Sequence, residues 1–256
     1  MADSDSGDPA RTMALLWRDP TARSTQRGPR QGLTVTRIVT VAIELADADG
    51  VQAVTMRQVA QALGVAPMSL YTYVPGKAEL LDLMLDAVYL HMTRTDMADK
   101  PWRTRVEVVA KENRDLYERH PWAATISASR PPLGPGLMAK YEHELTAFAG
   151  LGLDDVQMDA SLTYLLSFVQ ASARAAAESA AVQRDSAMSD EQWWAANAPL
   201  LARVFDETAY PTAARVGAAA GAAHNGAYSP THAYEFGLQR VLDGLGVLID
   251  GIVRHP

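Results

Sequence analysis

Two short helices joined by a tight turn are the feature that most constrains how this sequence folds. The stretch TMRQVAQALG (residues 55–64) starts with a threonine and has a glutamine three residues later, the capping-box pattern of a helix start. Gly64 is typical of a helix end, and Pro67 is typical of the first position of the next helix. Pro75 leaves that second helix room for about two turns. The spacing predicts a helix-turn-helix.

The second short helix, in MSLYTYV (residues 68–74), has one face for packing and another for contact. Leu70 and Val74 lie four residues apart and are predicted to pack against the preceding helix. The other face is then free to enter the major groove of DNA, where the first residues of the helix meet base edges. Similar helix pairs also occur in helical proteins that bind no nucleic acid, so spacing alone leaves both interpretations open. The outward side chains are those of Met68, Ser69, Tyr71, Thr72 and Tyr73.

The remaining sequence has the helical spacing of apolar residues almost throughout, and we find no convincing strand pattern. Thr34 is predicted to cap a helix that ends at Gly50, and another helix begins after Gly76. Residues 207–230 are rich in Ala and Gly and are predicted to form a partly ordered loop. The expected fold class is therefore all-α. Further helices are predicted at about residues 103–119, 121–128, 136–149, 154–184, 190–206 and 231–253.

Composition narrows the functions that the chain can have. Of its 256 residues, 48% are hydrophobic, which is enough for a globular core. The net charge of −7 argues against a uniformly basic nucleic-acid binder but allows a local basic patch. Cysteine is absent, which excludes disulfides, thiol catalysis and cysteine-ligated metals. Neither a long apolar run nor a signal-peptide pattern is present, so a soluble, cytoplasmic protein is expected.

The first 32 residues differ from the rest. They are rich in Pro and Gly without sustained periodicity, and we expect a flexible arm. Within the arm, ALLW (residues 14–17) is either a short docking segment or a local feature without consequence. Basic arms beside a helix-turn-helix can enter the minor groove, and the alternative is a solvated tail. The arginines that follow the acidic start are Arg11, Arg18, Arg23, Arg27 and Arg30.

Residues 34–88 carry three motifs in one continuous stretch. They are the helix T-M-R-x-V-A-x-x-L-G-V, the helix S-L-Y-x-Y-V and the helix start K-x-E-L-L. The stretch resembles the N-terminal DNA-binding domain of the tetracycline-repressor (TetR) family. The C-terminal segment YEFGLQRVLDGLGVLIDG resembles the last helix of the tetracycline-repressor branch. The expected domains are an arm (1–32), a helix-turn-helix domain (33–77) and a ligand-binding and dimerisation domain (78–256).

The resemblance implies roles within the helix-turn-helix by position. The start of the supporting helix often touches DNA, the front of the recognition helix reads base edges, and its aromatic positions usually hold the phosphate backbone. Lys77 matches a lysine that grips a phosphate. The sequence departs from the tetracycline repressor itself at residues 66–68 and 72, so its base preference is not transferred. The predicted DNA-binding residues are Thr55, Arg57, Pro67, Met68, Ser69, Tyr71, Thr72, Tyr73 and Lys77.

The last predicted helix carries a heptad-like apolar row and three glycines seven residues apart, the last of them Gly251. Such glycines weaken a helix and suggest close approach by another helix. The resemblance implies that this helix and residues 154–184 form a four-helix dimer interface, while intrachain packing is the alternative. The predicted dimer residues are Gly237, Leu238, Leu242, Gly244, Leu245 and Ile249.

Between these regions we expect an effector pocket, because aromatic side chains with a few polar groups suit a small-molecule site between helices. For any one of these residues, core packing is the alternative. Arg130 loosely matches a pocket arginine that precedes a proline in the tetracycline repressor. The candidates are Trp102, Asn113, Tyr117, Trp122, Arg130, Tyr164, Phe168, Gln170 and Trp194.

No hydrolase, phosphate-binding or dinucleotide motif is present, and the histidines form no metal-binding pattern. The acidic run DDVQMD (residues 154–159) is interpreted as a helix cap rather than a magnesium site. We therefore expect no catalytic residues, no cofactor and no metal. The predicted function is a one-component repressor that binds a pseudo-palindromic operator as a homodimer and is released by a small molecule. The alternative is a small helical ligand-binding protein or enzyme that binds no DNA.

Overall fold

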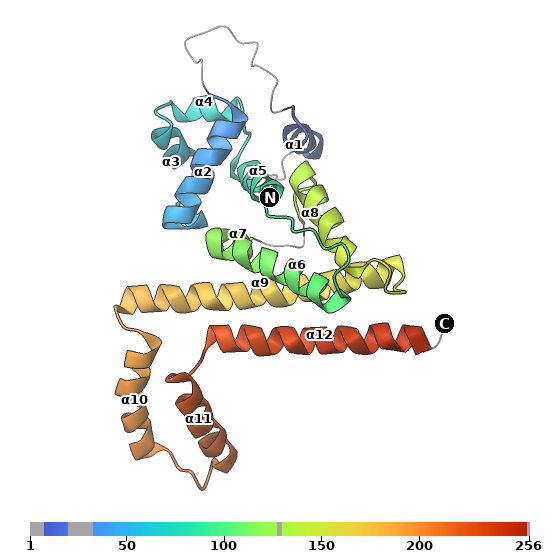
Figure 1. The fold of residues 1–256 in the computed structure, drawn as a ribbon. Coiled ribbons are helices and arrows are strands. Elements are labelled where there is room, and N and C mark those ends of the chain that lie inside the picture. The colour runs from blue at the N-terminus through green and yellow to red at the C-terminus, as the bar shows by residue number, and fades with distance from the viewer. Residues whose placement is uncertain (1–7, 20–32, 127–129, 255–256) are drawn as a thin grey trace, which may run out of the picture.

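The computed structural model describes residues 8–19, 33–126 and 130–254, and no β-strand occurs in these ranges, which confirms the all-α prediction (Figure 1). None of the described helices is long and apolar enough to cross a membrane. The helices are α1 (Pro9–Leu16), α2 (Val35–Asp49), α3 (Met56–Ala62), α4 (Pro67–Tyr71), α5 (Lys77–Leu90), α6 (Trp102–Arg119), α7 (Pro121–Thr125), α8 (Pro135–Leu145), α9 (Asp155–Ser186), α10 (Asp190–Val204), α11 (Pro211–His224) and α12 (Pro230–Arg254), with short 3-10 segments at Val51–Ala53 and Thr146–Phe148.

Helices α2, α3 and α4 form a small N-terminal bundle, in which side-chain caps begin α2 and α3 and Pro67 begins α4. The Thr34 hydroxyl accepts the backbone N–H of Arg37 at 3.1 Å. The Thr55 hydroxyl accepts the N–H of Gln58 at 3.2 Å and donates to the Gln58 side chain at 2.8 Å. The predicted capping box is thus half formed, because the glutamine bonds the cap hydroxyl and not the cap N–H. Gly64 ends the supporting helix at φ 68°, which favours glycine.

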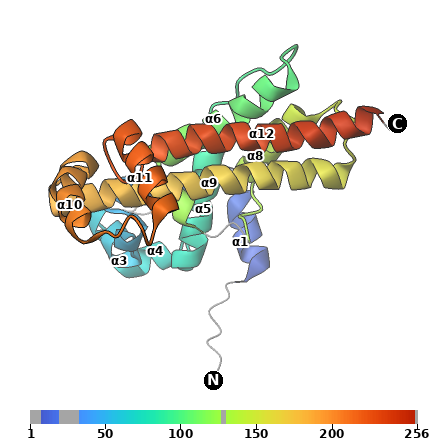
Figure 2. The ribbon, with the colours of Figure 1, turned by 90° about the horizontal axis from the view of Figure 1, so that it is seen from below.

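The larger C-terminal region is a stack of helices around two long ones. Helices α9 and α12 run side by side along one edge of the molecule, and α10 and α11 form a hairpin that projects from one end of the pair (Figures 1 and 2). Helix α6 packs on the inner side of α9, while α5 packs against both α2 and α8. Helix α5 therefore belongs to both regions and joins them.

The expectation of a wholly flexible N-terminal arm is wrong for residues 8–19. Asp8 caps α1, whose Leu16 is buried against the core. Trp17 donates from Nε1 to the Leu133 carbonyl at 2.8 Å, which holds the end of α1 beside α8. The apolar stretch ALLW is thus a docking segment, because Leu16 is buried, Leu15 is partly buried against the core, and α1 packs on α5. Arg23, Arg27 and Arg30 lie outside the described residues.

Two expected boundaries also change. Residues 207–230, expected to be a partly ordered loop, contain the helix α11 from Pro211. The reason is composition, since an alanine-rich run has high helix propensity and proline is favoured at the first helical position. Conversely, α4 has only five residues and is shorter than the two turns predicted. Its last residue is Tyr71 and its C-cap is Thr72, three residues before Pro75.

We expect Gly136→Ala to lower the free energy of unfolding by about 2–3 kcal/mol, because the packing of α8 on α5 leaves no space for a side chain. A Cβ on Gly136 would lie 1.9 Å from the backbone oxygen of Asp86, so the two helices would have to separate. Gly217 in α11 is the matched control, since a Cβ there meets nothing within 4 Å. Urea unfolding of both variants checks this, and equal effects of the two substitutions would contradict it.

Candidate nucleic-acid interface and effector cavity

The helix-turn-helix is held by the face of α4 that the sequence predicted. Leu70 and Val74 are fully buried, together with Val59 and Ala60 of α3. Both helices lie at the end of the molecule away from α9 and α12 (Figure 1). The prediction that Leu70 and Val74 are core residues is confirmed, and the opposite face of α4 is left free for contact.

That free face carries one prominent apolar side chain and one exposed tyrosine. Met68 is 75% exposed and Tyr71 is 41% exposed, whereas the ring of Tyr73 is half-buried against the core. Pro67 and Thr72 are exposed and Ser69 is half-buried. Of the two tyrosines in YTY, Tyr71 is therefore the more available for contact with a partner.

Two cations flank this face. Arg57, two residues into α3 from its Thr55 cap, is exposed, and Lys77 begins α5 with its side chain half-buried. Neither cation forms an ion pair within the parts of the chain that the structure describes. Their charges are therefore available for phosphate groups of a nucleic acid that approaches α3 and α4.

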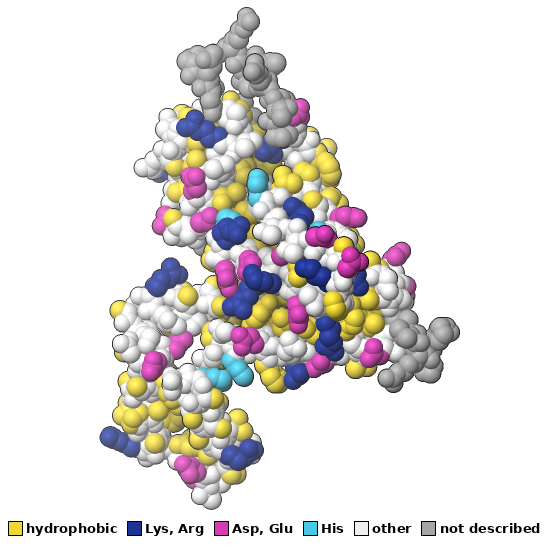
Figure 3. Space-filling view, viewed as in Figure 1, with side chains coloured by type: hydrophobic (Ala, Val, Ile, Leu, Met, Phe, Trp, Pro, Cys, Tyr) yellow, Lys and Arg dark blue, Asp and Glu magenta, His cyan; other side chains and the backbone are white. Residues whose placement is uncertain are grey.

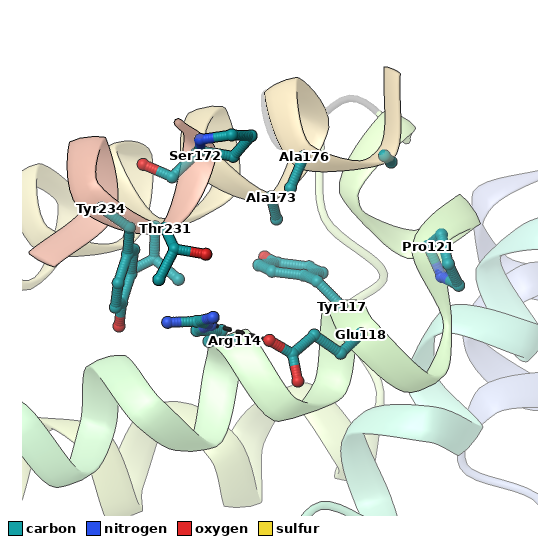
Figure 4. Close-up of a pocket in the computed structure, with 12 residues that line it drawn as sticks. Arg114, Tyr117, Glu118, Pro121, Ser172, Ala173, Ala176, Thr231 and Tyr234 are labelled. Carbon is teal, nitrogen blue, oxygen red and sulfur yellow. Dashed lines mark hydrogen bonds and ion pairs between the residues drawn. The ribbon is translucent and has the colours of Figure 1, made fainter. Parts of the chain in front are cut away.

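A cavity of about 240 Å³ lies between α6, α7, α9 and the start of α12; we call it the effector cavity (Figure 4). Small side chains of α9 make the space, because the helix presents Ser172, Ala173 and Ala176 where larger residues would fill it. Tyr117 and Tyr234 supply aromatic faces from α6 and α12. The lining residues are Arg114, Tyr117, Glu118, Pro121, Val169, Ser172, Ala173, Ala176, Ala177, Pro230, Thr231 and Tyr234.

The polar groups of the effector cavity are arranged around Arg114. Its Nε donates to Glu118 at 2.7 Å, and its guanidinium lies 4.5 Å from the ring centre of Tyr234. Burial raises the pKa of Tyr117 and of Tyr234 above the ordinary tyrosine value. Both phenols are therefore neutral at physiological pH and can donate hydrogen bonds to a ligand.

The predicted effector residues are spread more widely than this cavity. Tyr117 lines the effector cavity. Phe168 does not line it but stacks on Tyr234, which does, with the two ring centres 5.8 Å apart. Gln170 holds α7 by donating to the Ala124 carbonyl at 2.9 Å. Trp122 is buried, and its Nε1 donates to Asp47 of α2 at 2.7 Å.

The other candidates lie away from the effector cavity. Trp102, the first residue of α6, lies against Gly246 of α12. Trp194 packs against Gly221 inside the α10–α11 hairpin. Tyr164 is exposed on α9, and Arg130 is exposed in the loop before α8. Sequence spacing does not reveal the positions of Trp102 and Trp194, because each packs against a glycine that is remote in the chain.

Asn113 belongs to a buried polar cluster formed with Lys140 and Glu144. Lys140 Nζ lies 2.7 Å from each Glu144 carboxylate oxygen, and Asn113 Nδ2 donates to one of them at 2.5 Å. The Asn113 Oδ1 atom is buried and accepts no hydrogen bond from the described residues. In the described ranges, no three His, Asp or Glu side chains are grouped so that they could hold a metal ion.

The apolar row of α12 faces α9 within the same chain. Leu242 is fully buried, Leu245 and Ile249 are buried, Leu238 is partly buried against the core, and Gly237 lies against Phe168. Leu242, Leu245 and Ile249 are therefore covered within the chain, as the intrachain alternative has it, while Gly237 and Leu238 are only partly covered. Of the six predicted dimer residues, only Gly244 is exposed. Heptad spacing predicts that a helix face is covered, but it does not show whether the covering helix belongs to the same chain or to a partner.

Several residues of the effector cavity were missed at the sequence level. Arg114 lies one turn before Tyr117 on α6, and Tyr234 lies in the first turns of α12. The available signal was the small-residue run at 171–177 of α9, which leaves a gap wherever helices cross it. The space becomes a cavity only because α12 returns across that run.

An exposed helix-turn-helix joined to a helical domain with a cavity is the arrangement of the ligand-responsive DNA-binding regulators. The chain belongs to the TetR family of these regulators. Residues 38–84 match the profile of the bacterial regulatory proteins of the tetR family, and residues 96–249 match the tetracyclin repressor-like C-terminal domain. Regulators of this family are generally not enzymes. Membership implies an operator, a small-molecule ligand and a second subunit as partners.

Individual relatives agree with this assignment. The chain is 40% identical to the HTH-type transcriptional repressor DrrR1 of Streptomyces coeruleorubidus over 96% of its own length and 88% of that protein. It is also similar to the TetR family protein ActR of Streptomyces coelicolor in complex with actinorhodin, with a TM-score of 0.67 and 26% identity over 84% of this chain and 96% of ActR. The ActR complex with (S)-DNPA has a TM-score of 0.66, also with 26% identity, over 84% of this chain and 98% of ActR.

Proposed function

We propose that this regulator is a repressor that binds a pseudo-palindromic operator as a homodimer and leaves it when a small molecule enters the effector cavity. The observation that carries the proposal is the free face of α4, which Leu70 and Val74 hold outward beside α3. The 40% identity to a named repressor favours repression over activation. The protein has no need of catalysis in this role.

Base reading is assigned to the front of α4. Met68 is 75% exposed there and offers apolar contact, for example to a thymine methyl group. Ser69 and Thr72 add short hydroxyl groups, while Pro67 shapes the start of the helix. Phosphate contact is assigned to the surrounding residues, which are Thr55, Arg57, Tyr71, Tyr73 and Lys77.

The second subunit is assigned to the outer face of α9 and α12. This face carries Val247 (76% exposed), Val156 (78% exposed) and Tyr164, with the open positions Gly244 and Gly251 between larger residues. The two helices present it side by side (Figure 2). Exposed apolar side chains on two adjacent helices suit a protein interaction site, and two-fold pairing of such helices gives a four-helix interface. The pairing sets the two α4 helices one DNA turn apart, about 34–36 Å.

Release is assigned to α7, which connects the effector cavity to the DNA-binding bundle. Pro121 lines the cavity, and its neighbours reach α2: His120 Nδ1 lies 2.8 Å and Trp122 Nε1 lies 2.7 Å from the same oxygen of Asp47. A ligand that displaces α7 therefore moves α2, which packs on α5, and so changes the separation of the two reading heads. Coupling of about 1–3 kcal/mol is typical of such sites.

A planar ligand with a hydrogen-bond acceptor fits the effector cavity best. The faces of Tyr117 and Tyr234 suit an aromatic ring, and their neutral hydroxyls and Arg114 suit a carbonyl, phenolate or carboxylate oxygen. ActR, whose solved complexes contain actinorhodin and (S)-DNPA, supports a small-molecule effector for this chain.

A mobility-shift assay with the DNA upstream of the protein's own gene tests the proposal. Native protein is expected to bind one fragment with a strong dependence on salt, and Lys77→Ala is expected to weaken binding to all sequences alike and to reduce the slope of log K against log salt by about 1. Lys111→Ala, on the exposed face of α6, is the matched control. A folded dimer that binds no promoter fragment specifically would instead support the alternative of a helical binding protein without DNA.

A further inference from the structure

A second and larger cavity lies at the junction of the two regions, and it shares no lining residue with the effector cavity. It has a volume of about 550 Å³, and we call it the junction cavity. Its walls come from the end of α1, from α2, from α5 and from the residues that begin α7 and α8. Histidine side chains gather on this side of the molecule near α5 and α7 (Figure 3). The space is large enough for a drug-sized molecule.

Most of the wall of the junction cavity is apolar. Leu16 of α1 forms one side, Val39 and Ile43 of α2 form a second, and Leu83 and Leu90 of α5 form a third. Leu16, Val39 and Leu83 are buried in the core, so these walls are fixed by packing. An apolar ligand body would therefore enter preformed space.

The charges in the junction cavity are not balanced. Arg18 donates to the Leu15 carbonyl at 2.8 Å and interacts electrostatically with the buried Asp86, whose carboxylate accepts the N–H of Leu137 at 2.9 Å. Glu44 lines the cavity from an exposed position of α2, near Thr36 and Thr40 of the same helix, and forms no ion pair with any described residue. Arg18 interacts with Asp86, so Glu44 is the lining carboxylate without an ion-pair partner among the described residues.

Two histidines complete the polar lining of the junction cavity, and both are already oriented. His91 Nδ1 lies 2.7 Å from the Ala87 carbonyl and must donate to it, which leaves Nε2 as an acceptor when the ring is neutral. His120 Nδ1 is occupied by Asp47 at 2.8 Å. Within the described residues, neither ring forms a hydrogen bond or an ion pair with Glu44.

The wall formed by α1 lies outside both family profiles, which match residues 38–84 and 96–249. Leu16 and Arg18 are nevertheless ordered parts of the cavity, and Trp17 anchors them to Leu133. The junction cavity is thus built partly by a segment that the general family pattern does not contain.

We propose that the junction cavity is a second small-molecule site and that it binds an amphipathic amine, with the ammonium group at Glu44 and the apolar body between α1, α2 and α5. The carboxylate selects a cation, and the apolar walls select a ring or chain of moderate size. Because α2 and α5 pack on one another and each forms a wall of the cavity, occupancy changes the angle between the DNA-binding bundle and the rest of the chain. The site is separate from the effector cavity, and its ligand is a cation rather than an oxygen-rich ring.

Fluorescence titration of the full-length protein with dansylcadaverine tests the proposal, since this probe joins an apolar ring system to an ammonium group. Dansylglycine, which carries a carboxylate, is the control probe and is expected to bind at least about tenfold more weakly. Glu44→Gln is expected to weaken dansylcadaverine binding about fivefold, whereas Glu142→Gln, an exposed glutamate on α8, leaves it unchanged.

Two filling variants locate the probe. Thr40→Trp places an indole in the junction cavity from an exposed position of α2, and it is expected to reduce binding at least about tenfold. Ala176→Trp fills the effector cavity from an exposed position of α9 and is expected to leave dansylcadaverine binding unchanged. The proposal is overturned if the native protein does not bind the probe, if neither Thr40→Trp nor Glu44→Gln weakens binding, or if Ala176→Trp abolishes it. These outcomes do not involve DNA and are independent of the proposed repressor function.

Discussion

Replacing Glu144 with leucine is expected to lower the free energy of unfolding by about 3–5 kcal/mol, the largest effect on stability of any single substitution considered for this chain. Glu144 is 2% exposed and holds the ammonium group of Lys140 through both carboxylate oxygens at 2.7 Å. Without the carboxylate, Lys140 keeps a buried charge whose remaining neighbour is the ring of Tyr89, 5.3 Å away. The Asn113 amide also loses an acceptor.

Urea unfolding at neutral pH measures this cost, and a double-mutant cycle separates its causes. The pair Lys140→Met with Glu144→Leu is expected to recover most of the loss, because it removes the uncompensated charge and fills the space with apolar atoms. Glu142→Leu, two residues earlier on α8 and exposed, is the control and is expected to change stability by less than about 0.5 kcal/mol. A single variant within about 1 kcal/mol of the native protein, or a double variant no better than the single one, would contradict the explanation.

Val247→Arg is expected to prevent pairing of subunits and to weaken operator binding by at least about 100-fold. Val247 is 76% exposed on α12 and contributes nothing to the core, so the folded chain should tolerate the change. In a two-fold interface the substitution acts twice, because each subunit presents the same residue to its partner. The two arginines would then be desolvated close together without acceptors.

Sedimentation equilibrium and mobility shift measure the two consequences of Val247→Arg separately. Met138→Arg is the matched control, since Met138 is 40% exposed on α8, away from the outer face of α9 and α12. That variant is expected to remain dimeric and to bind the operator normally. If Val247→Arg remains a dimer of native affinity, the outer face of α9 and α12 is not the subunit interface.

Local chemistry made much of the fold predictable. Thr34, Thr55 and Pro67 begin helices where the sequence predicts, because caps and proline act within one turn. Leu70 and Val74 are buried as predicted, since a spacing of four residues defines a face of a helix. Helix α11 was not predicted, because glycine and proline in this segment indicate a loop although the alanines around them favour a helix.

The two kinds of site differ in how far they could be predicted. The candidate DNA-binding residues are close together in sequence, so the motif that carries them also places them. The effector cavity is assembled from α6, α7, α9 and α12, and Tyr117 is the only candidate from the sequence that lines it. The junction cavity was not anticipated at all, because α1 was expected to be flexible.

The sequence by itself determined most of the helices, though not α1 or α11, together with the helix-turn-helix and the face of α4 that is free, because these follow from interactions between residues a few positions apart. The tertiary structure alone decided that Leu242, Leu245 and Ile249 pack inside the chain and that α1 docks on α5. It also decided where the two cavities lie. Burial of an apolar face is non-directional, so a helix pattern states that a partner exists, and only the packed chain shows which partner it is.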